Sequence, residues 1–96
     1  MIKTVVVAGS TARLSCKFTD FKGEFVDPEI VKLIIYNCKY KVLEEHTVSM
    51  KNELGEYVHN LITNEKPQTY IVEWYGEIDG YSSIHREQFI TKQMSD

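Results

Sequence analysis

Cysteine and histidine are the residues of this chain to consider first for nucleophilic catalysis, as the nucleophile and its base. Cys16 and Cys38 carry thiols, and a thiol becomes a nucleophile only when a nearby base or a helix N-terminus lowers its pKa. The available bases are His46, His59 and His85, which fall on three separate expected strands. No spacing in the sequence brings a histidine to either thiol. We therefore expect no catalytic cysteine and no enzymatic activity.

The two cysteines could instead form a disulfide. A disulfide needs Cα atoms within about 7 Å and Cβ vectors that converge. Strand alternation places Cys16 on an apolar face, whereas Cys38 falls on the same face as Lys32 and Tyr36. We therefore expect two free thiols, both buried or half-buried. The absence of a signal-peptide pattern agrees with synthesis in a reducing compartment.

Metal-binding and phosphate-binding motifs are the next candidates. The cysteines and histidines lack the C-x2-C or H-x3-H spacing that preorganises zinc, and a half-buried strand position is the simpler interpretation of His59. Carboxylates for calcium could come from Asp20, Glu24 and Asp27, but their spacing favours a solvated acidic loop. Neither G-x-x-x-x-G-K nor G-x-G-x-x-G occurs. We expect no cofactor-binding residue and no metal ligand.

Charge and hydropathy bear on the class of partner. Eleven Lys and Arg against fourteen Asp and Glu give a net charge of −3, which leaves no basic excess for a phosphate backbone. The run Lys39-Tyr40-Lys41 places an aromatic ring between two cations, as in proteins that bind single strands. Glu44 and Glu45 follow it at once, which favours a polar turn or an edge strand. The longest aliphatic run is far shorter than the roughly 20 residues of a membrane span. We expect neither nucleic acid nor membrane as a partner.

Aromatic side chains remain as candidates for a contact surface. Trp74 is expected in the core, and Tyr75, on the opposite face of the same strand, is expected to point outward. Tyrosine provides contact area at a low entropy cost, which is why interfaces favour it. The candidate interface residues are Tyr75, Tyr81, Tyr40 and Phe21.

The elements that must position these side chains are β-strands. Val, Ile, Thr and aromatic residues account for 36 of 96 positions, whereas there are only two Ala and five Leu. Ninety-six residues form one domain with one modest core. The sequence therefore predicts a single all-β domain over residues 1–96. We expect strands over residues 2–7, 11–19, 29–37, 41–45, 47–50, 55–62, 69–77 and 81–91, followed by a frayed tail at 92–96.

Three of these segments carry further expectations. Residues 29–37 are apolar on both faces, so the strand should be covered on both sides, although a short helix after Pro28 is an alternative. Asp79-Gly80 suits a type I′ turn and predicts a hairpin between residues 68–78 and 81–91. Residues 2–7 and 41–50 are expected at sheet edges. The fold class that follows is an immunoglobulin-like antiparallel β-sandwich of seven to eight strands.

Several short motifs follow one another in a set order. A strand that ends in Phe-Thr-Asp leads into a short loop with a glycine, and Asp-Pro then precedes an alternating strand. A Gly-x-Tyr motif, a Tyr-Ile-Val-Glu-Trp strand and a closing Gln-Phe-Ile come later. These motifs are residues 12–20, Gly23, and residues 27–33, 55–57, 70–74 and 88–90. Over about residues 10–91, this order resembles the small immunoglobulin-like β-sandwich proteins and domains of tailed-bacteriophage virions.

The resemblance implies a non-enzymatic structural or accessory protein of the virion, made in the bacterial cytoplasm. It would belong to the capsid, neck, tail or baseplate, and would dock onto other virion structural proteins as a symmetric ring or as a decoration. The chain departs from the antibody form of the fold, because Tyr57 has no cysteine two residues later. Two alternatives remain: a carbohydrate- or cell-surface-binding immunoglobulin-like module of a phage or bacterial surface protein, and an enzyme or inhibitor that blocks a host protein.

Overall fold

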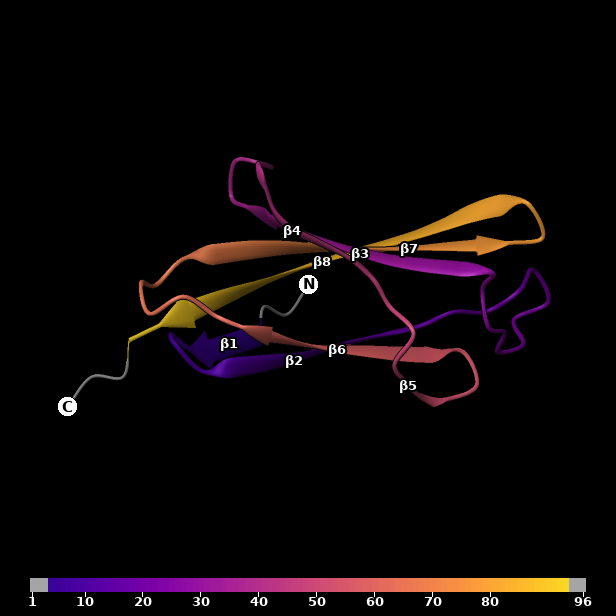
Figure 1. Cartoon of the computed structure of the whole chain (residues 1–96), viewed down its shortest axis with the longest axis horizontal. Helices are drawn as coiled ribbons and strands as arrows, with labels where there is room; N and C mark the ends of the chain where they lie inside the picture. The colour runs from indigo at the N-terminus through magenta and orange to yellow at the C-terminus, as the bar shows by residue number, and fades with distance from the viewer. Residues whose placement is uncertain (1–3, 94–96) are drawn as a thin grey trace.

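Eight β-strands make up the fold within residues 4–93, which are the residues that this computed structural model describes. They form two sheets that stack as two layers (Figure 1). The five-stranded sheet has the order β1 (Thr4–Val7), β8 (Tyr81–Lys92), β7 (Thr69–Ile78), β3 (Ile30–Asn37) and β4 (Val42–Thr47). The three-stranded sheet has the order β2 (Thr11–Lys17), β6 (Glu56–Ile62) and β5 (Lys51–Glu53).

The strand order is that of an immunoglobulin-like sandwich. One sheet places β8, β7, β3 and β4 side by side, as strands G, F, C and C′ lie in a variable-type domain, and the other places β2, β6 and β5 as strands B, E and D. The all-β sandwich predicted from the sequence is confirmed. It is not wholly antiparallel, however, because β1 pairs with the end of β8 in parallel, from Thr4 opposite Phe89 to Val7 opposite Lys92.

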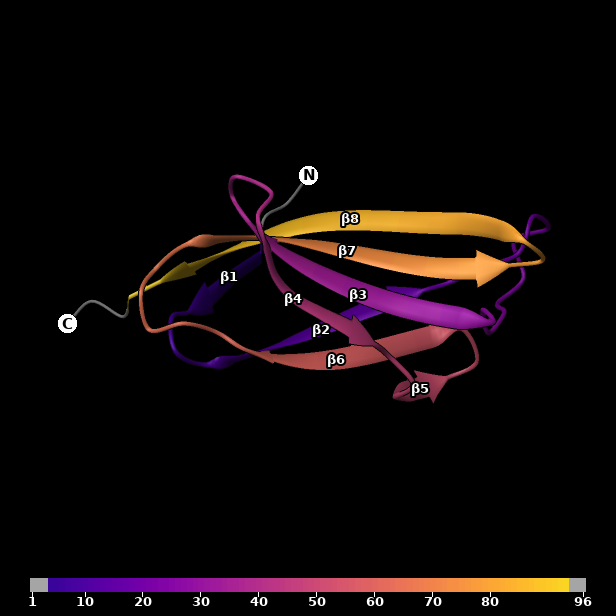
Figure 2. The same ribbon diagram turned by 45° about the horizontal axis from the view of Figure 1, so that its top comes forward.

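The parallel pair has a simple cause in the path of the chain. The hairpin partner β7 occupies one edge of β8, and β1 occupies the other edge from Phe89 to Lys92. Figure 2 shows β1 beside the C-terminal part of β8, away from the β7–β8 turn. The chain then turns at Gly9, whose φ of +88° favours glycine, and enters β2 in the other sheet.

The core lies between the two sheets and follows from strand alternation. On β2, the buried Ala12, Leu14 and Cys16 alternate with exposed residues, so one face of the strand packs inward. Trp74 on β7 is 1% exposed and is the largest fully buried side chain, which confirms that it faces the core. Among residues 4–93 there is no helix that could cross a lipid bilayer.

The expectation that residues 29–37 are covered on both sides is wrong. On β3, Val31, Leu33 and Ile35 are buried against the other sheet, but Lys32 is exposed and Ile34 only half-buried. This is the outer face of the five-stranded sheet, where only neighbouring side chains shield the strand. The helical alternative is also wrong, because the whole segment pairs with β7 in register.

The hairpin at the end of the chain forms as predicted. Asp79 and Gly80 both have positive φ angles, +50° and +81°, as a type I′ turn requires. The register of β7 and β8 runs without a bulge from Thr69 opposite Ile90 to Ile78 opposite Tyr81. Tyr75 therefore stays on the outer face.

The strands predicted at 41–45 and 47–50 are replaced by one continuous strand. The chain forms β4 and then leaves the sheet at Val48, which is buried and donates its N–H to the carbonyl of Val31. It enters the facing sheet as the short β5, so the crossover occupies the place of the second predicted strand. As expected, β1 and β4 lie at the edges of their sheet.

The predictions for the two chain ends extend beyond residues 4–93. Of the first predicted strand, residues 2–3 lie outside the described residues. Of the predicted frayed tail, residues 94–96 lie outside them as well. Lys92 does not belong to a tail, because it is the last residue of β8 and pairs with Val7.

Candidate functional site

The structure brings two of the four candidate interface residues into contact. The rings of Phe21 and Tyr81 meet edge to face with centroids 5.5 Å apart. Both are largely in solvent, at 81% and 65% exposure. A shallow hollow of about 100 Å³ lies between them, with Ile78 at its base. Two large aromatic side chains thus stand together on the surface at one end of the sandwich.

The loop that carries Phe21 is held by its own hydrogen bonds. Asp20 Oδ1 accepts the backbone N–H groups of Lys22 and Glu24, at 2.9 and 3.0 Å. An isolated antiparallel bridge joins Thr19 to Phe25 across the same loop. The acidic loop is exposed to solvent, as expected, and it is also an ordered turn, because the Asp20 carboxylate accepts hydrogen bonds from the backbone.

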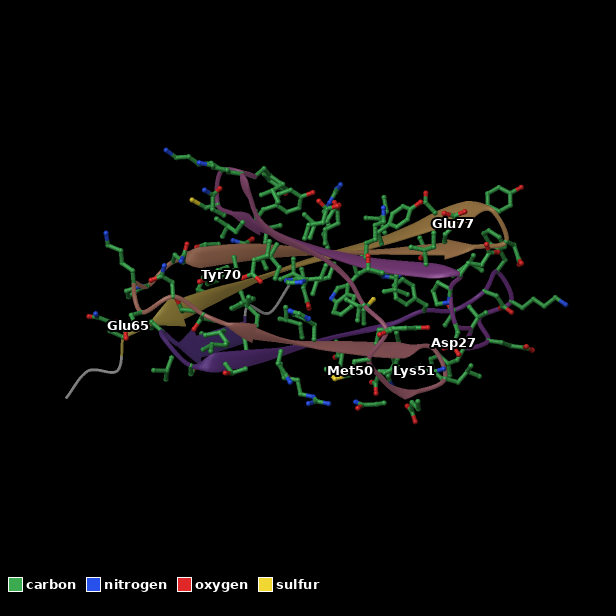
Figure 3. All side chains as sticks on the ribbon, in the orientation of Figure 1. Asp27, Met50, Lys51, Glu65, Tyr70 and Glu77 are labelled. Atoms are coloured by element: carbon green, nitrogen blue, oxygen red, sulfur yellow. The ribbon has the colours of Figure 1, made fainter. Side chains whose placement is uncertain are left out.

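A clamp formed by Asp27 joins this loop to the β5–β6 turn. Asp27 accepts hydrogen bonds from the ammonium of Lys51 and from the N–H of Gly55, and Figure 3 shows Asp27 and Lys51 side by side at this end. The bond from Lys51 is the main cause that lowers the pKa of Asp27. Two further exposed apolar side chains, Phe25 and Leu54, are carried by the two segments that the clamp joins. We call Phe21, Phe25, Leu54 and Tyr81 the apolar end.

The other two candidate interface residues lie elsewhere. Tyr40 occupies the β3–β4 turn, at the opposite end of the sandwich (Figure 1), with φ of +61° and its ring 5.5 Å from that of Tyr36. Asn37 Oδ1 accepts the N–H groups of Lys39 and Lys41, so this segment is the polar turn that the sequence indicates. Tyr75 is half-buried on the outer sheet face, opposite Ile84.

A charged group on that outer face was not anticipated from the sequence. Glu73 is only 9% exposed, and its carboxylate accepts a 2.6 Å bond from Arg86 Nε and a 3.2 Å bond from the Tyr36 hydroxyl. The Arg86 bond and charge compensate the burial of Glu73, so this group is a satisfied structural pair. The signal that could have found it is the hairpin register, which places Glu73 opposite Arg86.

Both cysteines are free, as predicted, and Cys16 is buried. The expectation that Cys38 is at least half-buried is wrong, because it lies in the β3–β4 turn and is exposed. Burial, and secondarily the charge of Glu87, raise the pKa of the Cys16 thiol to about 12. Cys16 therefore carries its proton at neutral pH and cannot act as a thiolate.

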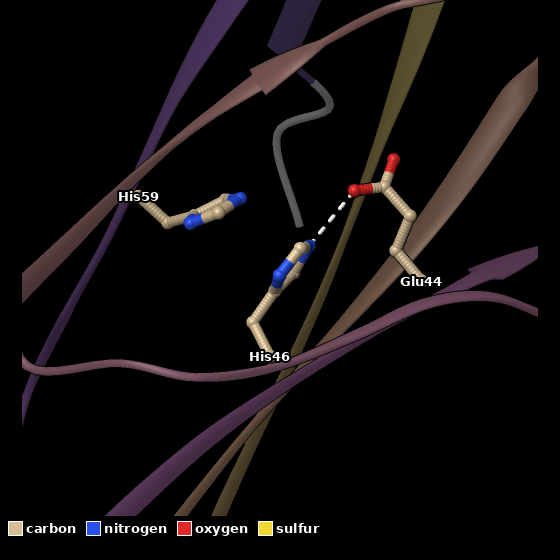
Figure 4. Close-up of side chains that lie close together, drawn as sticks. All are labelled: Glu44, His46 and His59. Carbon is tan, nitrogen blue, oxygen red and sulfur yellow. Dashed lines mark hydrogen bonds and ion pairs between the residues drawn. The ribbon is translucent and has the colours of Figure 1, made fainter.

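Three side chains that the sequence analysis kept apart converge in the structure: Glu44, His46 and His59 (Figure 4). His46 Nε2 lies 2.8 Å from Glu44 Oε1, and the two imidazole rings have centroids 4.4 Å apart. Burial, and then the neighbouring His46, lower the pKa of His59. The side chains come from β4 and β6, in different sheets, and each is half-buried as His59 was expected to be. Two imidazoles and a carboxylate are ligands that suit a divalent transition metal.

Comparison with known proteins finds no relative of this chain. No protein family, no curated protein and no solved structure matches the chain. Conclusions about its function therefore rest on its own side chains, chiefly the apolar end and the Glu44–His46–His59 cluster.

Proposed function

We propose that this chain is a non-enzymatic structural or accessory protein that works through protein–protein contacts in the virion of a tailed bacteriophage. The setting comes from the resemblance in sequence, which implies the capsid surface or the neck, tail or baseplate. The observation that supports a contact function is the exposed pair Phe21 and Tyr81 at the apolar end.

Exposed aromatic rings are a source of binding energy. Burying a side chain such as Phe21 under a partner is worth about 1.5–3 kcal/mol. Interface residues that contribute most are enriched in aromatic types and gather in a central cluster. Phe21 and Tyr81 form such an aromatic pair, and Phe25 and Leu54 are exposed at the same end of the sandwich.

The loops at this end are ordered before any partner arrives. The Asp20 turn and the Asp27 clamp fix the loop that presents Phe21, and the type I′ turn fixes the start of β8. A preordered surface loses less conformational entropy when it binds, so more of the contact energy appears as affinity.

Sheet edges offer a second means of contact. The edge strand β4 pairs only with β3 among the described strands, and it exposes Val42 and Leu43. Its free backbone groups could pair with a strand of a neighbouring subunit. We expect the apolar end to provide affinity, and the edge to set the orientation of a ring or a decoration.

The test is mass spectrometry of purified particles of the phage that encodes the chain. We expect the chain in the particles at a fixed ratio to the other structural proteins. The double substitution Phe21→Ser with Tyr81→Ser should deplete it from the particles, whereas Tyr40→Ser, an equally exposed tyrosine at the other end, should not. Circular dichroism of each purified variant checks that it still folds.

Two outcomes would contradict the proposal. Absence of the wild-type chain from intact particles would remove the virion role. Binding of the wild-type chain to a glycan array, lost in the double variant, would instead show a carbohydrate-binding module.

A further inference from the structure

The Glu44–His46–His59 cluster occupies positions that a sandwich normally fills with apolar side chains. Glu44 lies opposite Ile35 and His46 opposite Leu33 on β3, and both of these partners are fully buried on the inner face. On β6, His59 shares its face with Tyr57 and Leu61, both of which are buried. All three polar side chains therefore point into the space between the sheets, at the open flank where β4 faces β6.

The bonds present in the structure do not account for this arrangement. The one hydrogen bond recorded inside the cluster joins His46 Nε2 to Glu44 Oε1. The rings of His59 and His46 lie close together and are tilted by 34°, a proximity that two protonated imidazoles would resist by mutual repulsion. A cation between the three groups would satisfy both rings and the carboxylate at once.

We propose that Glu44, His46 and His59 bind one divalent transition-metal ion, with Zn²⁺ as the best match, and that the ion ties the edge strand β4 to the facing strand β6. Two of the ligands lie two residues apart on one face of β4, and the third comes from the other sheet. Figure 4 shows His59 reaching toward the other two from the opposite ribbon.

The distances are compatible with closure around an ion. The ligand atoms of the three residues all lie within 4.8 Å of one another. On a tetrahedral zinc ion with bonds of about 2.0–2.1 Å, two ligand atoms lie roughly 3.4 Å apart. To reach that spacing, the farthest ligand atoms must approach by at most roughly 1.4 Å and the 2.8 Å His46–Glu44 pair must open by roughly 0.6 Å, which are shifts that side-chain rotation can supply. Water would complete the coordination, because the described residues place three protein ligands here.

The donor set selects the class of ion. Imidazole nitrogen suits Zn²⁺, Ni²⁺ and Cu²⁺, whereas Ca²⁺ and Mg²⁺ prefer oxygen ligands throughout. When the ion binds His46 Nε2, the neutral imidazole carries its proton on Nδ1, and bonds from the ion to Nε2 and to Glu44 Oε1 replace the hydrogen bond between these two atoms.

The test uses the full chain without a histidine tag, titrated with ZnCl₂ by isothermal titration calorimetry and followed by thermal unfolding. We expect one equivalent bound and a Tm that rises until one equivalent is reached, because the ion binds the folded state. Neither CaCl₂ nor MgCl₂ should compete. His46→Gln and His59→Gln should each weaken Zn²⁺ binding by at least roughly tenfold.

Matched controls separate this site from other metal ligands on the chain. His85→Gln removes the remaining histidine, which lies against Phe18 on the other flank, and Cys38→Ser removes the exposed thiol. Both variants should bind Zn²⁺ as the wild type does. Loss of binding in Cys38→Ser, or full binding in a His46→Gln, His59→Gln double variant, would overturn the proposal.

A measurement on the wild type covers the case in which a variant fails to fold. Paramagnetic Ni²⁺ at one equivalent should broaden the imidazole NMR signals of His46 and His59 and leave those of His85 sharp. Equal broadening of all three, or no broadening, would show that the cluster does not hold the ion.

Discussion

Gly76 is a position where the addition of one methyl group should strongly lower the free energy of unfolding. It lies inside β7 with ordinary strand backbone, so alanine there meets no conformational obstacle. A Cβ at this position would lie 2.5 Å from Phe18 Cε1, 2.9 Å from Phe18 Cδ1 and 3.0 Å from Pro28 Cγ. Phe18 is fully buried, with its ring packed edge to face on Tyr57 and His85.

The magnitude follows from two opposing effects. Replacing glycine by alanine in a compatible backbone stabilises by about 0.4–1 kcal/mol, because the unfolded chain loses freedom. Overpacking a well-filled core costs about 1–3 kcal/mol. The contact is about 1 Å shorter than the 3.5–4.0 Å optimum, and a fully buried ring has no free direction to move, so the cost should reach the top of that range. We expect Gly76→Ala to lower the free energy of unfolding by about 2 kcal/mol.

Urea unfolding followed by tryptophan fluorescence measures this loss, and a double-mutant cycle assigns its cause. Phe18→Leu makes room at the contact, so Gly76→Ala should cost much less in that background, with a coupling energy above about 1 kcal/mol. Gly80→Ala is the control: its positive φ makes alanine unfavourable, but nothing lies within 4 Å, so its cost should not depend on Phe18. A neutral Gly76→Ala, or a cost that Phe18→Leu leaves unchanged, would refute the packing argument.

Three further predictions concern other parts of the chain. Trp74→Ala should cost about 3–5 kcal/mol in urea melts, as for other buried aromatic side chains, and Tyr75→Ala much less; the reverse ranking would contradict their faces. The bond from Lys51 lowers the pKa of Asp27 in the folded state, so the stabilisation from this pair is present above the unfolded pKa and is lost as pH falls through the folded pKa. Asp27→Asn should therefore flatten the acid limb of a stability–pH curve, and an unchanged limb would argue against the clamp. Cys16, whose pKa burial raises to about 12, should resist iodoacetamide at pH 8 while the exposed thiol reacts; rapid double labelling would contradict its burial.

Local patterns explain which parts of the fold could be predicted. Alternation with period two fixes the face of each residue once a strand is recognised, so the inward Trp74 and outward Tyr75 are correct. The Asp79-Gly80 turn is equally local, since both residues tolerate positive φ. The parallel pairing of β1 is not local, because it joins the first and last strands of the chain along the edge of β8 that its hairpin partner leaves free.

The convergence of Glu44, His46 and His59 could not be predicted for a related reason. Alternation shows that Glu44 and His46 share a face of one strand and that His59 shares a face with Tyr57 and Leu61. Whether those two faces oppose each other depends on the chain leaving β4 at Val48 and crossing to the other sheet. The sequence does contain one usable signal, which is a pair of polar residues two positions apart on the inward face of an apolar sheet.

The proposed contact surface and the proposed metal site are built from separate parts of the fold, and this separation has a physical consequence. The apolar end is carried by the β2–β3 loop and the β5–β6 and β7–β8 turns, whereas the cluster joins β4 to β6 through inward-facing side chains. Because Glu44 and His46 point inward, an ion held by them leaves the backbone of β4 free to pair with another strand. An edge strand that is tied to the opposite sheet is also less free to move, so it loses less conformational entropy when a neighbouring strand pairs with it. Metal binding should therefore favour contacts made through β4 and leave those made through Phe21 and Tyr81 unchanged.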